Sequence, residues 1–187
     1  MRIIAGKHKN RVIPTLKKSD YRPSTTKFRE ALFSILSSGG LVDTKQVNGA
    51  HVLDLFAGTG SLSFEALSRG ASSITLVDNC REHLDLAIEF ARKIGEFNNI
   101  SVLVADATFL SKAPRKYSLV FMDPPYHNNF VIKTLICLVK NGWLTDGAII
   151  AVEMSKRENI ELIDEVQLVK EKIYGNNKLL ILRYEQK

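Results

Sequence analysis

The segment Asp123-Pro124-Pro125-Tyr126 places a carboxylate, two prolines and an aromatic ring directly after an apolar run, residues 117–122. That run is typical of a buried strand, so the segment is expected at the carboxyl edge of a sheet, where open α/β folds bind ligands. Prolines lack an N–H and can extend neither a strand nor a helix. Asp123 and the Pro124 carbonyl could then each accept one N–H of a planar amine, with the Tyr126 ring stacked on the base. The alternative is an ordinary Pro-Pro turn with an exposed tyrosine.

Alternating strands and helices from residue 51 onward position this segment. The predicted strands are 51–56, 73–77, 100–104, 117–122, 148–153, 166–173 and 178–184. The predicted helices are 61–68, 81–95 and 130–140, with short helical segments near 107–111 and 157–163. The turn Gly175-Asn176-Asn177 predicts a closing hairpin. This order indicates an α/β fold with a mostly parallel, doubly wound, seven-stranded sheet that contains one antiparallel strand.

The first forty residues form a separate basic segment. Two short β-type runs, 2–5 and 11–14, flank a turn that carries Lys7, His8 and Lys9, which predicts a small hairpin. A helix is expected over 26–38, ended by two glycines. We therefore expect two parts: residues 1–40 as a basic extension made of the hairpin and helix, and residues 41–187 as the α/β domain that carries the Pro-Pro segment.

The positive charge of the chain is concentrated in this extension. Residues 1–30 carry nine Lys or Arg and two acids, a net charge of +7, whereas the remainder has a net charge of −1. A basic face on a nearly neutral body is typical of nucleic-acid binding, and the alternative is a solvated basic tail. The residues predicted to contact phosphates are Lys7, Lys9, Arg11, Arg22 and Arg29.

A glycine turn follows the first strand, in residues 52–60. Gly58 and Gly60 would let the backbone approach a cofactor closely, as in nucleotide-binding turns. A dinucleotide site would favour a third glycine at the position of Ser63, and a carboxylate from Asp54 at the mouth of the site would repel a pyrophosphate. S-adenosylmethionine (SAM) carries a sulfonium and an ammonium, so we interpret the turn as a SAM site rather than an NAD site.

Acidic residues also follow the next two strands. Asp78 could accept the ribose hydroxyls, and Asp106 the adenine amine, with the Ala107 N–H facing a ring nitrogen. Each acid alone could be an ordinary helix cap, but their repetition at successive strand ends indicates a cofactor site. The predicted cofactor-binding residues are Asp54, Phe56, Ala57, Gly58, Gly60, Asp78, Asn79, Asp106 and Ala107.

The chain resembles the RsmD family of methyltransferases over nearly its whole length. The similar segments are residues 2–7, 22–33, 54–60, 65–71 and 123–126. Segment 123–126 is also similar to the Asp/Asn-Pro-Pro-Tyr/Phe signature of SAM-dependent enzymes that modify exocyclic amines. Ser24 and His8 depart from the family pattern, and residues 174–178 follow it only loosely.

This resemblance implies a Rossmann-like class I fold and an enzyme that methylates the exocyclic N2 of a guanine in 16S ribosomal RNA. SAM would be the methyl donor and S-adenosylhomocysteine the product. The catalytic residues would be Asp123, Pro124, Pro125 and Tyr126, with His127 facing the substrate. The RNA could be free or part of a partly assembled small subunit.

Two other functions are compatible with the same residues: an adenine-N6 methyltransferase acting on DNA or RNA, and a non-catalytic RNA-binding module. Cys80 and Cys137 match no metal or redox spacing, so we expect reduced thiols and no metal. The N-terminal residues lack a signal-peptide core, and no apolar run is long enough to span a membrane. These features predict a cytoplasmic protein.

Overall fold

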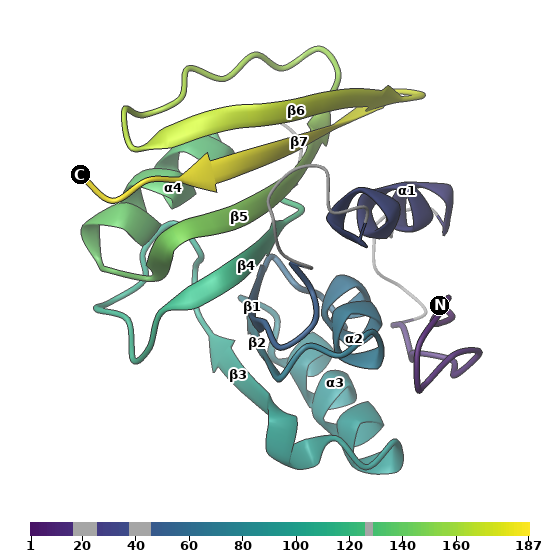
Figure 1. The fold of residues 1–187 in the computed structure, drawn as a ribbon. Coiled ribbons are helices and arrows are strands. Elements are labelled where there is room, and N and C mark those ends of the chain that lie inside the picture. The colour runs from purple at the N-terminus through teal and green to yellow at the C-terminus, as the bar shows by residue number, and fades with distance from the viewer. Residues whose placement is uncertain (17–25, 38–45, 126–128) are drawn as a thin grey trace.

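A single seven-stranded sheet organises the molecule (Figure 1). The structure is a computed structural model that describes residues 1–16, 26–37, 46–125 and 129–187. Its elements in chain order are α1 (Thr26–Ser37), β1 (His51–Leu55), α2 (Ser61–Ser68), β2 (Ser73–Asp78), α3 (Arg81–Lys93), the short 3-10 helix η1 (Phe97–Asn99), β3 (Ile100–Val104), β4 (Tyr117–Met122), α4 (Phe130–Lys140), β5 (Leu144–Ser155), β6 (Val166–Tyr174) and β7 (Asn177–Tyr184).

The strand order is β3-β2-β1-β4-β5-β7-β6, and the first five strands of the chain pair in parallel. β7 is antiparallel to both of its neighbours, β5 and β6, which confirms the predicted single antiparallel strand. The chain winds outward from β1 to β3 and then returns to β4 on the other side of β1. This reversal places a topological switch between β1 and β4, where such sheets bind ligands.

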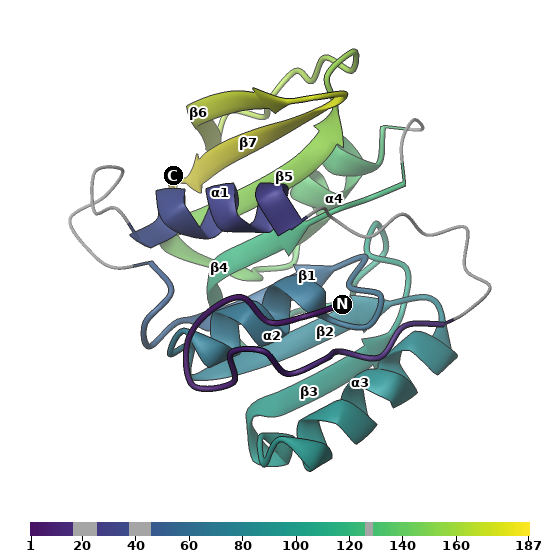
Figure 2. The ribbon, with the colours of Figure 1, turned by 90° about the vertical axis from the view of Figure 1, so that its right-hand side faces the viewer.

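Helices cover both faces of the sheet, so the parallel strands are buried on both sides. Figures 1 and 2 show α1, α2 and α3 on one face and α4 on the other. One apolar cluster joins Leu32, Leu67 and Ala87 on the three-helix face, and a second gathers around Leu135 and Leu138 on the α4 face. Burial on both faces explains why β1 and β4 are nearly continuous apolar runs.

Helix α1 packs directly on the sheet. The Phe33 ring meets that of Phe121 in β4 with centroids 5.7 Å apart, and Phe28 meets Tyr174 of β6 at 5.9 Å. The apolar residues of α1 recur at helical spacing, so one face can be buried in this way. Through these contacts α1 belongs to the same hydrophobic core as the sheet and the helices α2 and α3.

The predicted N-terminal hairpin is present, although only one bridge, between Arg2 and Val12, is regular antiparallel structure. The Ile3 N–H donates to the Arg11 carbonyl at 3.0 Å, and the Asn10 N–H donates to the Ile3 carbonyl at 2.9 Å. Figure 2 shows this segment running along the outer side of α2 and α3. Its placement decides which basic residues are exposed on this side of the molecule.

Residues 107–111 contain a single turn, in which the Phe109 N–H donates to the Asp106 carbonyl at 3.0 Å. The turn does not extend into a helix, because the Asp106 carboxylate bonds the N–H and hydroxyl of Thr108 and competes with helical pairing. Two local predictions were wrong. Residues 157–163 are non-helical, since Ile160, Leu162 and Ile163 pack against the α4-side core at nearly alternate positions.

Strand β5 begins at Leu144, four residues before the predicted start at residue 148. The pairing register with β4 shifts between Tyr117 and Leu119, and Gly147 has a φ of 73°. A bulge therefore accommodates Gly147 within the longer strand. Among the residues described, no helix is long and apolar enough to cross a bilayer.

Candidate cofactor and catalytic site

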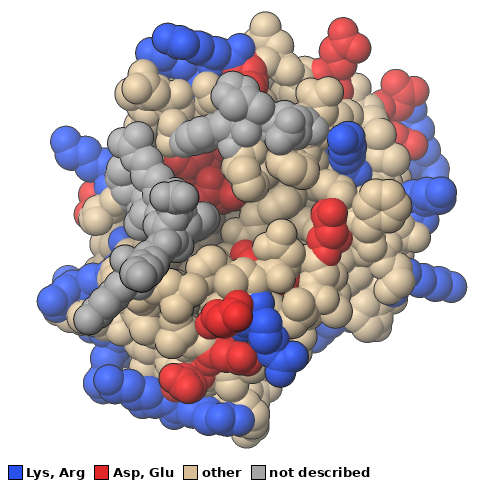
Figure 3. All heavy atoms as spheres, turned by 180° about the vertical axis from the view of Figure 1, so that it is seen from behind, with Lys and Arg blue, Asp and Glu red and all other residues tan. Residues whose placement is uncertain are grey.

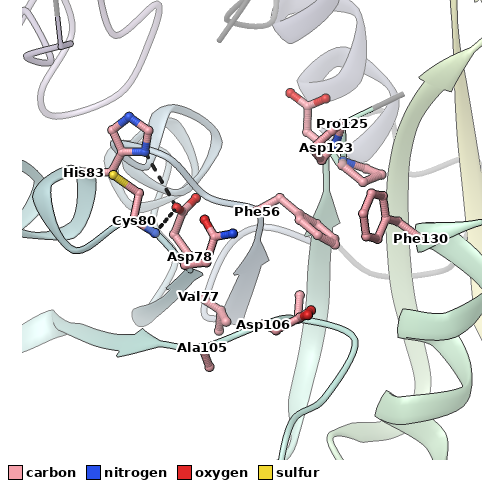
Figure 4. Close-up of a pocket in the computed structure, with 13 residues that line it drawn as sticks. Phe56, Val77, Asp78, Cys80, His83, Ala105, Asp106, Asp123, Pro125 and Phe130 are labelled. Atoms are coloured by element: carbon pink, nitrogen blue, oxygen red, sulfur yellow. Dashed lines mark hydrogen bonds and ion pairs between the residues drawn. The ribbon is translucent and has the colours of Figure 1, made fainter. Parts of the chain in front are cut away.

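A cavity of about 560 Å³ opens at the carboxyl ends of the parallel strands (Figure 4). Its size lies within the range of small-molecule and cofactor sites, about 300–1,000 Å³. Residues from the ends of β1, β2, β3 and β4 and from the start of α4 form its wall. The described lining residues are Phe56, Val77, Asp78, Asn79, Cys80, His83, Ala105, Asp106, Ala107, Asp123, Pro124, Pro125 and Phe130. The topological switch thus holds a cavity of cofactor size.

Asp78 connects the end of β2 to the glycine turn after β1. Its Oδ2 accepts the Gly58 N–H at 2.7 Å, and its Oδ1 accepts the Cys80 N–H at 2.8 Å. The His83 Nδ1 lies 3.6 Å from Oδ1. A carboxylate oxygen has two lone pairs, so Asp78 can also accept hydroxyls from a ligand. Asn79 follows it on the cavity wall.

Asp106 lines the cavity from the end of β3. Its Oδ1 accepts the Thr108 N–H at 2.8 Å and the Thr108 hydroxyl at 2.7 Å, which fixes the carboxylate in one orientation. Ala107 is buried beside it on the same wall. Asp106 and Ala107, which were predicted to hydrogen-bond the edge of the adenine ring, therefore lie together on the cavity wall.

The end of β4 contributes Asp123, Pro124 and Pro125 to the cavity, as the Pro-Pro segment predicted. Figure 4 shows Asp123 and Pro125 on the opposite side of the view from Asp78. Tyr126 and His127 lie outside the described residues. The described part of the motif thus shares one cavity with the acids of β2 and β3.

Asp54 does not lie at the mouth of the site as predicted. It is 2% exposed and does not line the cavity, because its Oδ2 accepts the Ser63 N–H at 3.3 Å and the Ser63 hydroxyl at 2.8 Å. Burial raises the pKa of Asp54 to about 7, although the hydrogen bonds from Ser63 oppose this effect. The charge argument against a pyrophosphate therefore depends on Asp78, Asp106 and Asp123, which do line the cavity.

The glycine turn lies beneath the cavity. Ala57, Gly58 and Gly60 are buried, and none of the three is among the described lining residues. A Cβ on Gly60 would approach the Leu76 side chain to 2.9 Å, and its φ of 79° also favours glycine. These glycines allow a tight turn packed against β2, and their direct contact with a cofactor stays a prediction.

Several lining residues were not predicted from the sequence: Val77, Cys80, His83, Ala105 and Phe130. Val77 and Ala105 directly precede the acids that were selected, so their position at strand ends was a usable signal. Phe130 lies seven residues beyond Asp123 at the start of α4, and its ring centroid is 5.9 Å from that of Phe56. The positions of Phe56 and Phe130 in the sequence do not predict that contact.

Figure 3 views the molecule from behind Figure 1, the side toward which the parallel strands run. Acidic and uncharged side chains occupy the middle of this face, whereas Lys and Arg lie mostly around its outer edge. This distribution suits a cofactor with cationic groups and disfavours a bound pyrophosphate. Among the described residues no cluster of three or more His, Cys, Asp and Glu could hold a metal ion.

The residues predicted to contact RNA differ in solvent exposure. Lys9 and Arg11 are exposed, Lys7 is 53% exposed and forms an ion pair with Glu96, and Arg22 lies outside the described residues. Arg29 is 1% exposed, so its predicted phosphate contact is wrong. Its apolar neighbours on α1 draw that face of the helix into the core.

The hairpin turn also lies far from the cavity. The Lys7 N–H donates to the Ser68 carbonyl at 2.8 Å, at the last residue of α2, and His8 bonds Glu96, which follows α3. The open end of the hairpin, with Met1 and Leu16, lies against Ala57 and Thr59 near the glycine turn. The basic turn is therefore separated from the cavity edge at His83 by roughly the length of α3, about 20 Å.

The chain is similar in sequence to one family model and to proteins named as methylases or methyltransferases. The family model described as Conserved hypothetical protein 95 matches residues 1–183. A relative named uncharacterized methylase RP545, from Rickettsia prowazekii, is 37% identical over 98% of both chains. A second, named ribosomal RNA small subunit methyltransferase D, from Buchnera aphidicola, is 36% identical over 85% of this chain and 78% of its own length.

The fold is similar to that of a solved structure described as putative methyltransferase yhhF from Escherichia coli. The two chains are 30% identical, with a TM-score of 0.86 over 100% of this chain and 99% of the other. This similarity confirms the predicted Rossmann-like class I fold, including the parallel sheet and its one antiparallel strand.

Proposed function

This chain belongs to the RsmD family of methyltransferases, whose model is described as Conserved hypothetical protein 95, and we propose that it transfers a methyl group from SAM to the N2 amine of a guanine in 16S ribosomal RNA. The observation that carries the proposal is the shared cavity. It unites three strand-end carboxylates with the Pro124-Pro125 turn. Such an enzyme would work in the cytoplasm, on free RNA or on a partly assembled small subunit.

The cavity fits SAM in size, polarity and charge. Asp78 would accept the ribose hydroxyls, and Asp106 would accept the adenine amine beside the Ala107 N–H. The apolar wall formed by Phe56, Val77 and Ala105 suits the faces of a purine. When bound, SAM supplies an electrophilic methyl group on its sulfonium.

Asp123 and the Pro124 carbonyl would orient the target amine. The guanine N2 lone pair is delocalised into the ring, which makes this nitrogen a poor nucleophile. By accepting its two hydrogens, Asp123 and Pro124 would direct the lone pair toward the methyl group and favour the pyramidal nitrogen that attacks. Tyr126 would stack on the base, which must be unstacked from its neighbours to enter the site.

Positioning accounts for more of the expected rate enhancement than proton transfer. Hydrogen bonds to a charged acceptor contribute about 1.5–3 kcal/mol each, whereas holding two reactants in line supplies about 7–11 kcal/mol. No general base is required before transfer. His8 is unsuited to such a role, since it bonds Glu96 near the opposite edge of the sheet.

The exposed basic residues of the hairpin would contact the RNA backbone at a distance from the target base. Lys9 and Arg11 are the described candidates, and Arg22 stays a prediction. Residues 1–40 would then form the RNA-facing part of an otherwise catalytic chain. Ile3, Ile13 and Phe33 of this part are buried in the hydrophobic core between the sheet and the helices α2 and α3.

The test is transfer of labelled methyl from SAM to unmodified 16S RNA, free and in small subunits, followed by identification of the product nucleoside. We expect N2-methylguanine. Asp123→Ala should lower kcat by about 10- to 150-fold, the rate equivalent of one charge-assisted hydrogen bond, while S-adenosylhomocysteine binding is retained.

Asp164→Ala is the matched control, because that carboxylate is 88% exposed and pairs with Lys187 away from the cavity. It should methylate like the wild type. N6-methyladenine as the product would support the alternative amine target. An Asp123 variant with undiminished transfer would contradict the proposed catalytic role.

A further inference from the structure

Glu153 is a buried carboxylate in β5, next to the end of β4. It lies two residues before the end of β5 and is 4% exposed. Strands β4 and β5 pair in parallel, and their last printed partners are Met122 and Val152. One more residue in this register brings Asp123 beside Glu153, with backbones about 5 Å apart, the spacing of neighbouring strands. The two acids are therefore neighbours at the ends of adjacent strands.

The side chains of these two acids are directed to the same face of the sheet. Phe121 and Ala151, two residues earlier in each strand, both belong to the apolar cluster on the α1–α3 face. Because side chains alternate along a strand, Asp123 and Glu153 lie on that face as well. Figure 4 agrees for Asp123, whose carboxylate points away from Phe130 of α4. The carboxylates thus form a pair on one side of the strand ends.

Asn177 fixes the orientation of Glu153. It is the first residue of β7, and its Nδ2 donates to the Glu153 Oε1 at 2.6 Å. Glutamate side chains are rarely this buried unless they bond specific donors. A carboxylate has about four lone-pair sites, so the bond to Asn177 leaves Glu153 able to accept an N–H from a ligand. Glu153 is therefore a hydrogen-bond acceptor whose position is set by the fold.

The strand order places Glu153 on the side of Asp123 that faces away from the cofactor cavity. That cavity is formed by the ends of β1 to β4 and the start of α4, and Glu153 is not among its described lining residues. Strand β5 follows β4 on the side away from β1. A base that presents its amine to Asp123 must lie outside the volume of the cofactor. On the β5 side its edge would meet Glu153 next.

The hydrogen-bonding edges of the bases show which base suits two adjacent carboxylates. Guanine carries an N–H at ring N1 directly beside its N2 amine, so this edge has only donors next to each other. In adenine and cytosine, the ring nitrogen beside the exocyclic amine has no hydrogen and acts as an acceptor. A carboxylate would bond the guanine N1–H, whereas it would repel the lone pair of adenine N1.

We infer that Glu153 accepts the N1–H of the target guanine and thereby selects guanine over adenine. This inference rests on the proposed function and deepens it, because Asp123 and Pro124 alone could orient either amine. A site built to bond a substrate N–H discriminates strongly against an analogue that lacks it, since the buried acceptor is then left unpaired. Glu153 is thus a specificity-determining residue.

The experiment compares methyl transfer to 16S RNA that carries either guanine or 2-aminopurine at the methylated position. 2-Aminopurine keeps the amine at C2 but has no N1–H. For the wild type, kcat/KM should be about 10- to 150-fold lower with 2-aminopurine, the equivalent of one hydrogen bond to a charged group. Any intrinsic difference between the two amines is the same for every variant, so the ratio of the two kcat/KM values is compared between enzymes.

Glu153→Gln replaces an acceptor by a donor at this position. Its side-chain oxygen can still accept from Asn177, which leaves the N–H groups of the new amide for the base. The variant should lose the preference for guanine or reverse it, while S-adenosylhomocysteine binding is retained. A purely structural role for Glu153 would instead lower transfer to both RNAs by the same factor.

Glu171→Gln is the matched control, because Glu171 is exposed on the edge strand β6. It should keep the wild-type preference. A Glu153→Gln enzyme with the wild-type ratio would overturn the inference, whatever its overall rate. So would a wild type that uses both RNAs equally well, a measurement that does not depend on the folding of any variant. A wild type that forms no N2-methylguanine would contradict the proposed function itself.

Discussion

Asp54 shows how one residue can have a different role from the one its motif indicates. It is the second-last residue of β1, close to the glycine turn, yet its carboxylate is buried and accepts both hydrogen bonds from Ser63 near the start of α2. In this position it fastens the turn to the helix. Its effect on a cofactor is then indirect, through the shape of the turn.

The buried carboxylate of Asp54 should make stability depend on pH. Since its pKa is raised from 3.8 to about 7, the folded state keeps a proton that the unfolded state releases between these values. The contribution of Asp54 to stability therefore decreases as pH rises from about 4 to 7, by up to about 1.4 kcal/mol per pH unit. Asp54→Asn lacks this proton, so its stability relative to the wild type should increase over the same range.

Urea unfolding at pH 5, 6 and 8 would measure the effect, with the exposed Asp164→Asn as the control. A constant difference between wild type and Asp54→Asn across this range would show that the carboxylate is already ionised at pH 5.

At the scale of elements, three polar residues hold the N-terminal hairpin against the body. Glu65 of α2 accepts the Ile4 and Ala5 N–H groups at 2.7 and 3.1 Å. The Ser68 hydroxyl donates to the Ala5 carbonyl, and Glu96 bonds Lys7 and His8. The hairpin is thus a docked element rather than a free basic arm.

Glu96 should be the pH-sensitive part of this attachment. Burial alone would raise its pKa, but hydrogen bonds from Lys7, Asn99 and His8 outweigh burial and lower it to about 2. Because the folded pKa lies below the ordinary 4.5, the stabilisation is complete above about pH 4.5 and is lost as pH falls toward 2. Glu96→Gln should therefore be less stable than the wild type at pH 7 by about 1–3 kcal/mol, and this difference should shrink toward pH 3.

Thermal or urea unfolding at pH 7 and 3.5 would test this, with Glu171→Gln on the exposed edge strand β6 as the control. Equal stabilities of wild type and Glu96→Gln at pH 7 would refute the role of this carboxylate.

At the scale of the whole molecule, the charge separates into two regions. The cavity is lined by Asp78, Asp106 and Asp123, whereas exposed cations of the hairpin lie along the α2–α3 side. The N-terminal excess of +7 overstates the exposed charge, because Arg29 is buried and Lys7 is paired. RNA bound at both regions would have to extend across the helical face.

The salt dependence of RNA binding should distinguish these cations. Lys9→Ala and Arg11→Ala should each reduce the slope of log affinity against log salt by about one, since each removes one phosphate contact. Lys140→Ala at the end of α4, on the opposite helical layer, is the control and should leave the slope unchanged.

Filter binding of unmodified 16S RNA at 50 to 200 mM salt would measure the slopes. A slope unaffected by Lys9→Ala and Arg11→Ala, or reduced as much by Lys140→Ala, would mean that the hairpin does not contact the RNA backbone.

The sequence by itself determined the order of strands and helices, the single antiparallel strand, and the carboxylates at successive strand ends. These features depend on local periodicity and on the rule that parallel strands end at one edge, so they can be predicted without knowing side-chain contacts. Asp78, Asp106 and Asp123 reach the cavity for this reason.

Only the tertiary structure decided which charged and aromatic side chains are exposed to a ligand. Arg29 is buried because α1 packs on β4, Asp54 is buried because α2 begins above it, and Phe130 meets Phe56 because α4 starts beside the end of β1. Each of these outcomes depends on contacts between residues distant in the chain. Such contacts leave no periodic signal in the sequence, since they arise from how the layers pack.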